Sequence, residues 1–123
     1  MNLELDENNA VNLIKAYAPG KVIIRETTYT DNLIITPTRI LPHFQPAHLS
    51  ELTAAHLQCM LELNPRILIL GTGKDTVYVK PEIYGNLLNA GIGVETMNTH
   101  AACRTYNALA SENRDVAAIL MLA

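Results

Sequence analysis

Two segments of the sequence combine residue types that could bind a ligand. One is the loop GTGKD, Gly71 to Asp75, and the other is MNTHAACRTYN, Met97 to Asn107. Glycines let a backbone approach a ligand closely, and the first N–H groups of a helix can bind an anion. Lys74 and Arg104 would add positive charge. The loop and the helix start are therefore candidates to hold a carboxylate or a phosphate.

The GTGKD loop by itself matches no nucleotide-binding pattern. It lacks the first glycine of the phosphate-binding P-loop, and Asp75 stands where that pattern has Ser or Thr. Thr76 occupies the position of the third glycine in the dinucleotide fingerprint. A tight turn whose glycines adopt positive φ is the simpler interpretation. The loop thus predicts no ATPase, kinase or Rossmann oxidoreductase.

A helix beginning near Thr99 would separate its side chains into two groups. Residues spaced three and four apart share a helix face. The apolar face would carry Ala102, Cys103, Tyr106, Leu109 and Ala110. A polar stripe beside it would carry His100, Arg104, Asn107 and Ser111. The stripe is either a binding surface or a solvated face. Cys103 lies in the first turn, where the helix dipole lowers a thiol pKa. Its place on the apolar face of the helix predicts instead that it is a small buried residue that packs in the core.

A structural role for the same segment is the alternative. Glu95, in an otherwise apolar strand, either lies on the exposed side of the pleat or pairs with a cation such as Arg104. On this view Tyr106 and Asn107 would satisfy buried backbone groups, and Arg104 would pair with Glu95 or Glu112.

The remaining candidates for chemistry predict neither a metal site nor a catalytic site. His48 and His56 are eight residues apart, which is not the spacing that places two ligands on adjacent helical turns. His56 falls on an apolar face, so we expect a hydrogen-bonded core histidine. No Ser-His-Asp arrangement or pair of carboxylates stands out. We therefore predict no catalytic residue, no metal ion and no cofactor.

The composition predicts one soluble domain spanning residues 1–123. The chain is 49% hydrophobic with a net charge of −3, and its Lys and Arg residues are scattered, which excludes a general nucleic-acid affinity. The acidic start MNLELDENNA resembles neither a signal peptide nor a mitochondrial targeting sequence. The longest apolar run, Val116 to Ala123, is far shorter than the roughly 20 residues that span a bilayer. We expect a cytoplasmic protein with reduced thiols and no membrane insertion.

The hydrophobic pattern predicts an N-terminal antiparallel β-meander followed by alternating helices and strands. We expect strands over 11–17, 21–29 and 33–36, then a loop containing Pro37, Pro42 and Pro46. From about Pro46 onward the pattern predicts helices over 46–63, 81–91 and 99–113 and strands over 66–70, 92–97 and 116–122. One helix joins strands 66–70 and 92–97, so they should be parallel, with GTGKD beside the helix start at their carboxyl ends.

The C-terminal string GIGVETMNTHAACRTYNALASENRDVAAILM, with YTDNLIITP and LILGTGKD before it, closely resembles one small α/β family. That family is mostly uncharacterised and includes a mitochondrial assembly factor of respiratory complex I, NADH dehydrogenase 1 alpha subcomplex assembly factor 3. The most distinctive residues are Glu95, Thr99, Ala102, Arg104, Thr105, Tyr106, Asn107, Glu112 and Arg114. The resemblance implies a three-layer single domain with a mixed central sheet, and it supplies no catalytic residues.

Two functions follow from these observations. The first is a non-catalytic interaction or assembly factor whose partner is a subunit or assembly factor of a respiratory or membrane complex. The second is an enzyme or binding protein for a small anionic ligand at the carboxyl ends of the parallel strands. The candidate ligand-binding or interaction residues are Gly71, Thr72, Gly73, Lys74, Glu95, Thr99, His100, Arg104 and Asn107. The oligomeric state is left open.

Overall fold

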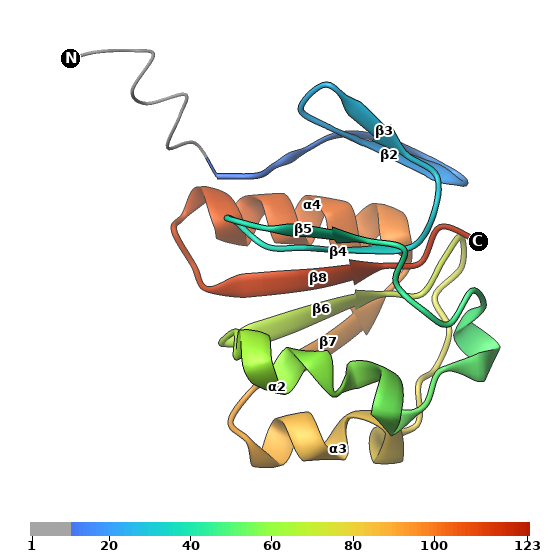
Figure 1. The fold of residues 1–123 in the computed structure, drawn as a ribbon, viewed down its shortest axis with the longest axis vertical. Coiled ribbons are helices and arrows are strands. Elements are labelled where there is room, and N and C mark those ends of the chain that lie inside the picture. Colours follow the sequence, from blue (N-terminus) through green and yellow to red (C-terminus); the bar gives the residue numbers. More distant parts are fainter. Residues whose placement is uncertain (1–10) are drawn as a thin grey trace.

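The computed structural model describes residues 11–123, which form two sheets and a set of helices (Figure 1). The central sheet has five strands in the order β5-β4-β8-β6-β7. They are β4 (Leu33–Ile35), β5 (Ile40–Pro42), β6 (Ile67–Gly71), β7 (Gly93–Met97) and β8 (Val116–Leu120). Strand β6 is parallel to β7 and β8, whereas β4 is antiparallel to β5 and β8. The central sheet is therefore mixed, as predicted.

A smaller sheet precedes the central one. Its strands β1 (Ile14–Ala18), β2 (Lys21–Ile24) and β3 (Thr27–Tyr29) are antiparallel and follow one another in chain order. The first part of the chain is thus a meander, shown in blue in Figure 1.

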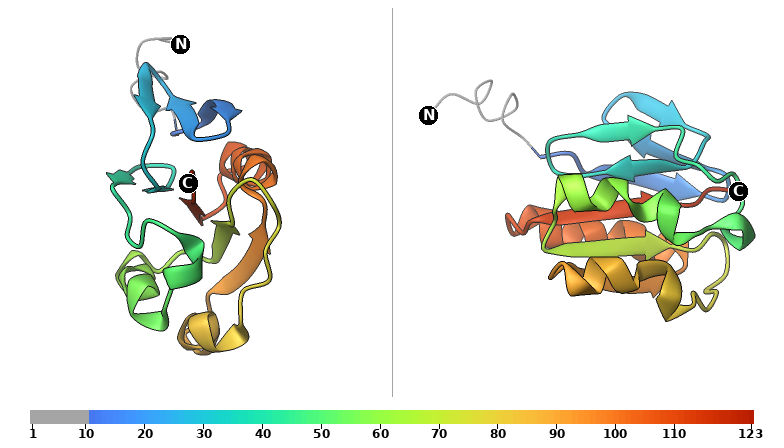
Figure 2. Two further views of the ribbon diagram at one scale, coloured as in Figure 1. Left: turned by 90° about the vertical axis from the view of Figure 1, so that its right-hand side faces the viewer. Right: turned by 60° about the horizontal axis from the view of Figure 1, so that its bottom comes forward.

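Layers of structure cover both faces of the central sheet (Figure 2). Helix α4 (Thr99–Ser111) and the smaller sheet share one core with strand side chains such as Ile69 and Leu120. Helices α2 (Cys59–Leu63) and α3 (Pro81–Asn89) share the other core with side chains such as Leu68 and Leu70. Because neighbouring strand residues point to opposite faces, each buried strand serves both cores. The predicted three-layer α/β fold is confirmed.

Two strand predictions differ from the structure. The single strand expected over 21–29 is the hairpin β2–β3, because Arg25 adopts a left-handed backbone with φ of 55° and turns the chain. The predicted third strand of the meander, β4, pairs instead with β8 in the central sheet. The loop expected around Pro42 also contains β5, an edge strand in which a proline at the end is tolerated.

The long helix predicted over 46–63 is wrong. The chain forms two 3₁₀ turns, η1 (Leu49–Glu51) and η2 (Ala54–Leu57), before α2. Extended backbone at Thr53, with ψ of 170°, interrupts the helix, and the Thr53 N–H donates to His56 Nδ1 at 2.9 Å. His56 is half-buried and closes a turn. It is not the core histidine that we expected. No helix within residues 11–123 has the length and apolar character needed to cross a bilayer.

Candidate functional site

The GTGKD loop and the start of α4 lie against each other, as the parallel strand pair predicted. The Thr99 hydroxyl accepts a hydrogen bond from the Gly73 N–H at 2.8 Å and donates one to the Met121 carbonyl at 2.7 Å. The Thr99 N–H donates to the Gly73 carbonyl at 2.8 Å. Thr99 is fully buried. It thus joins the loop, the helix and the segment after β8.

Gly71 is required because the helix start approaches the end of β6 so closely. A Cβ atom on Gly71 would lie 2.9 Å from Thr99 Oγ1 and 3.1 Å from the Ala102 Cβ. Gly73 has a φ of 106°, a backbone conformation that favours glycine. The glycines of GTGKD therefore serve close packing and a turn, the simpler of the two interpretations of this loop.

The backbone N–H groups that could hold an anion at the helix start are largely engaged. The Asn98 side chain caps the helix by accepting from the Ala101 N–H at 2.8 Å, and Gly73 takes the Thr99 N–H. Thr72 Oγ1 lies 2.7 Å from the Asp75 carbonyl and also accepts from the Val77 N–H at 3.2 Å. An anion here would therefore meet fewer free N–H groups than the sequence suggested.

Lys74 and Arg104 are both exposed, but they lie in different parts of the structure. Lys74 belongs to the loop, whereas Arg104 lines a groove of about 190 Å³ between β1 and α4. We call this the β1–α4 groove. It is lined by Ile14, Lys15, Ala16, Tyr17, His100, Cys103, Arg104 and Asn107. Three of the four residues of the predicted polar stripe, His100, Arg104 and Asn107, thus line one wall of this groove, whereas Ser111 does not.

Asn107 joins the two walls of the β1–α4 groove. Its Oδ1 accepts from the Ile14 N–H and its Nδ2 donates to the Ile14 carbonyl, both at 2.8 Å. Nearby, the Tyr17 and His100 rings stack with centroids 5.3 Å apart and an interplanar angle of 14°. Lys15 and Tyr17 were missed by the sequence analysis, because no spacing rule links them to a helix more than 80 residues later.

The structure supports part of the alternative in which the segment 95–112 has a structural role. The buried Tyr106 hydroxyl donates to the Asn12 carbonyl at 2.8 Å, and Asn107 satisfies Ile14. Burial raises the pKa of Tyr106. Arg104, however, pairs with no carboxylate among the described residues, and Glu95 lies exposed on the pleat. Tyr106 and Asn107 therefore have structural contacts, and Arg104 is left facing solvent.

Cys103 is a packing residue, as its position on the apolar face predicted. It is 3% exposed, and burial raises the pKa of its thiol to about 12. Since the thiolate is the nucleophile, this cysteine is unreactive near neutral pH. Cys59 of α2 is exposed. Within residues 11–123, no group of three His, Cys, Asp or Glu side chains is placed to hold a metal ion.

The groove at the carboxyl ends of the parallel strands is mainly apolar. It measures about 460 Å³ and is lined by Leu49, Ser50, Leu52, Thr72, Val77, Tyr78, Val79, Lys80 and Ile83. Tyr78 is 79% exposed at its rim. Apart from Lys80, no charged side chain lines it. This lining is better suited to an apolar group than to a small anion.

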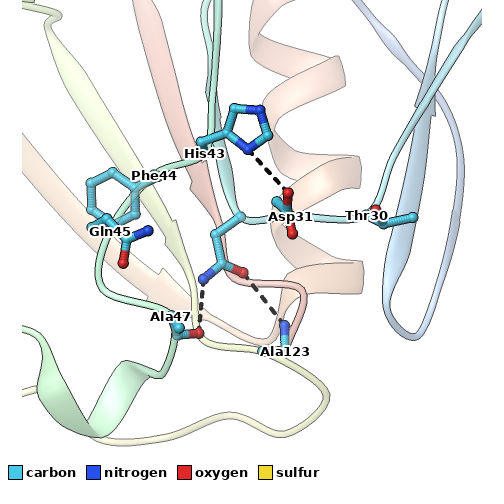
Figure 3. Close-up of a pocket in the computed structure, with 8 residues that line it drawn as sticks. Thr30, Asp31, His43, Phe44, Gln45, Ala47 and Ala123 are labelled. Atoms are coloured by element: carbon cyan, nitrogen blue, oxygen red, sulfur yellow. Dashed lines mark hydrogen bonds and ion pairs between the residues drawn. The ribbon is translucent and has the colours of Figure 1, made fainter.

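A further hollow lies where the β3–β4 connection meets the segment after β5 (Figure 3). The buried Asn32 amide accepts from the Leu122 N–H at 2.6 Å and donates to the Ala47 carbonyl at 2.9 Å. At its rim, His43 Nδ1 lies 3.0 Å from Asp31 Oδ2, an exposed surface contact of the kind that contributes little to stability. Asn32 thus fastens the loop before η1 to the segment after β8.

Comparisons with known proteins agree with the resemblance found in the sequence. Over 122 residues the chain is 31% identical to the "13 kDa major membrane protein" of Francisella tularensis subsp. holarctica (strain LVS), covering 98% of this chain and 99% of that protein. It is 34% identical over 117 residues to NADH dehydrogenase [ubiquinone] 1 alpha subcomplex assembly factor 3 of Danio rerio, covering 94% and 67% respectively.

Solved structures and a family model lead to the same assignment. A crystal structure from Bordetella parapertussis matches with a TM-score of 0.86 and 32% identity, over 93% of this chain and 98% of that one. The model of one protein family matches residues 14–121, which include both core layers and the β1–α4 groove. The chain therefore belongs to the family described as "Protein of unknown function (DUF498/DUF598)", which agrees with the family resemblance found in the sequence.

Proposed function

We propose that the protein is a non-catalytic assembly factor that binds a subunit of a respiratory complex during its biogenesis. The observation that carries this proposal is the 34% identity to a protein named as a complex I assembly factor, over 94% of this chain. The family model matches residues 14–121, so β1 and α4 both lie within the region that characterises the family. We further propose that the protein works from the cytoplasm on a membrane-bound partner.

The chemistry of the site supports binding more than catalysis. The side chain with the best position for a nucleophile, Cys103, is buried with its pKa raised to about 12. Among the α4 residues that line the β1–α4 groove, His100 and Arg104 are exposed, and Lys15 of β1 lines the same groove. These are groups that recognise a partner's charges and rings. A protein partner is therefore the ligand that the exposed residues fit best.

Affinity capture from the native host tests the proposal. An assembly factor binds partly assembled intermediates and leaves the finished complex. We therefore expect tagged protein to co-purify complex I subunits in native-gel bands smaller than the mature complex, with none in the mature band. An untagged strain controls for adhesion to the resin. Capture without any respiratory-complex subunit would overturn this role.

The alternative function is a small-anion site at the strand ends. Its support is the contact between GTGKD and the start of α4, together with the exposed Lys74. Phosphate titration followed by nuclear magnetic resonance tests it. Binding there predicts saturable shifts of the Gly73 and Lys74 amides that Lys74→Ala removes. Uniform small shifts across the surface would contradict a site.

A further inference from the structure

The β1–α4 groove carries positive charge on both of its walls. Strand β1 contributes Lys15 and α4 contributes Arg104, both of them exposed. The residues that line the groove include no Asp or Glu. Within residues 11–123, neither Lys15 nor Arg104 forms an ion pair. The whole chain has a net charge of −3, so this groove is locally positive on a protein that is negative overall. Its positive charge should attract a negatively charged partner.

The walls of the groove are held in place before any partner arrives. The two hydrogen bonds between Asn107 and Ile14 fix β1 against α4, and the stacked rings of Tyr17 and His100 bridge the same two elements. A surface that is already ordered loses less conformational entropy on binding. The two elements that form the groove are therefore ordered before binding, and Lys15 and Arg104 extend from its two sides.

The size of the groove favours an extended segment over a small molecule. Its volume of about 190 Å³ is below the roughly 300 to 1,000 Å³ of pockets that enclose small ligands. A single small anion would stay largely in water, where one charge contact contributes little. A peptide that crosses the groove can present separate carboxylates to Lys15 and Arg104, so its contacts add together.

We propose that the β1–α4 groove binds an acidic peptide segment of the protein partner. The Arg104 guanidinium would receive one carboxylate through paired N–H donors and the Lys15 ammonium another. The stacked rings of Tyr17 and His100 would contact the part of the peptide that lies between its two carboxylates. This inference rests on the proposed function and adds to it the surface used and the chemistry of the partner.

The binding test uses a fluorescent oligoglutamate peptide as the probe and fluorescence anisotropy as the readout. We expect saturable binding that weakens as salt is added, and a loss on the order of tenfold in affinity for the double variant Lys15→Glu/Arg104→Glu. Arg66→Glu/Arg114→Glu is the matched control, because it changes the charge equally at two exposed positions outside the groove. The control variant has the same change in net charge, and the general effect of that change on peptide affinity is measured from the salt dependence. After correction for this effect, the control should bind the peptide with wild-type affinity.

Two results would overturn the groove as the binding site. One is equal peptide affinity of the wild type and the groove variant, and the other is an equal loss in the control variant. Vesicles of phosphatidylserine and phosphatidylcholine form a separate arm. If they bind through Lys15 and Arg104 while the peptide does not, the groove faces a membrane and the peptide proposal fails. Thermal unfolding checks that the variants fold, and Lys15→Gln/Arg104→Gln replaces any variant that does not.

Complementation of a deletion strain separates this inference from the function on which it rests. Rescue of complex I content by the wild type and the control variant, but not by the groove variant, supports both. Equal rescue by all three overturns the groove and leaves the assembly role standing. A deletion with no effect on complex I overturns the assembly role, and the peptide measurements then decide the groove alone.

Discussion

The Asn107 side chain of α4 forms two hydrogen bonds to the backbone of Ile14 in β1, each 2.8 Å long. The amide thereby takes the place that a neighbouring strand would fill at the edge of the smaller sheet. It also sets the distance between the two walls of the β1–α4 groove. One side chain of the most distinctive segment thus connects the N-terminal meander to the C-terminal helix.

Asn107→Ala should destabilise the protein by about 2 kcal/mol, because the Ile14 N–H and carbonyl lose their partners in a half-buried place. Urea unfolding measures the loss. Hydrogen exchange should show the Ile14 amide exchanging faster than the rest of the core. Asn86→Ala is the control, since Asn86 is an exposed residue of α3, and alanine there should leave stability unchanged or slightly higher. Equal effects of the two substitutions would contradict the bridging role.

Thr99→Val should cost about 3 kcal/mol, because valine has the shape of threonine but cannot hydrogen-bond to Gly73 or Met121. Both backbone groups would be left buried without partners. Thermal and urea unfolding would measure the change. Thr105→Val, at a half-buried position of the same helix, should change stability by less than about 0.5 kcal/mol. A Thr99 variant as stable as the wild type would show that this hydroxyl does not hold the loop to the helix.

Gly71→Ala tests the close approach of β6 and α4. The added methyl would lie 2.9 Å from Thr99 Oγ1, which two hydrogen bonds hold in place, so we expect a loss of about 2 kcal/mol. Gly85→Ala is the opposite case. Gly85 lies inside α3 with open space around its Cα, and alanine there should stabilise by about 1 kcal/mol. Urea unfolding of both variants checks the difference in sign, and a neutral Gly71→Ala would contradict the packing.

Cys103 predicts a decline in stability at alkaline pH. Burial raises its pKa from about 9 to about 12, so the folded state keeps a proton that the unfolded state loses. The stabilisation is complete below the unfolded pKa and is lost as pH rises toward the folded pKa. Between these values the free energy of unfolding should fall by about 1.4 kcal/mol per pH unit. Cys103→Ala should make the decline shallower in urea unfolding across this pH range.

Cys59 serves as the control for that measurement. It is exposed, so Cys59→Ala should change the alkaline slope less, and iodoacetamide should label Cys59 in the folded protein at neutral pH while Cys103 stays unlabelled. Rapid labelling of Cys103 under native conditions would show that the thiol is accessible and would contradict the buried assignment.

The sequence predicts the second half of the chain better than the first. Strands such as β6 and β8 are short, uniformly apolar runs, and α3 has Pro81 at its start and Gly91 beyond its end, so local rules define them. The break at Thr53 and the turn at Arg25 depend on backbone conformations that these residue types adopt only in context. Hydrophobic periodicity alone therefore predicts one helix over 46–63 and one strand over 21–29, where the structure has several shorter elements.

The candidate site shows the same division. The contact between Gly73 and Thr99 could be predicted, because parallel strands bring their carboxyl ends to one edge of the sheet. The position of Lys15 beside Arg104 could not, because it depends on how the small sheet packs on α4. Tertiary packing, which no local pattern encodes, therefore creates the β1–α4 groove.

The amount of intact complex I in membranes of a strain lacking the gene tests the assembly role most directly. Native gels stained for NADH oxidation should show less of the mature complex and more of smaller intermediates, and a plasmid copy of the wild-type gene should restore the mature band. Unchanged mature complex and no intermediates, in cells that depend on complex I for growth, would contradict the assembly role.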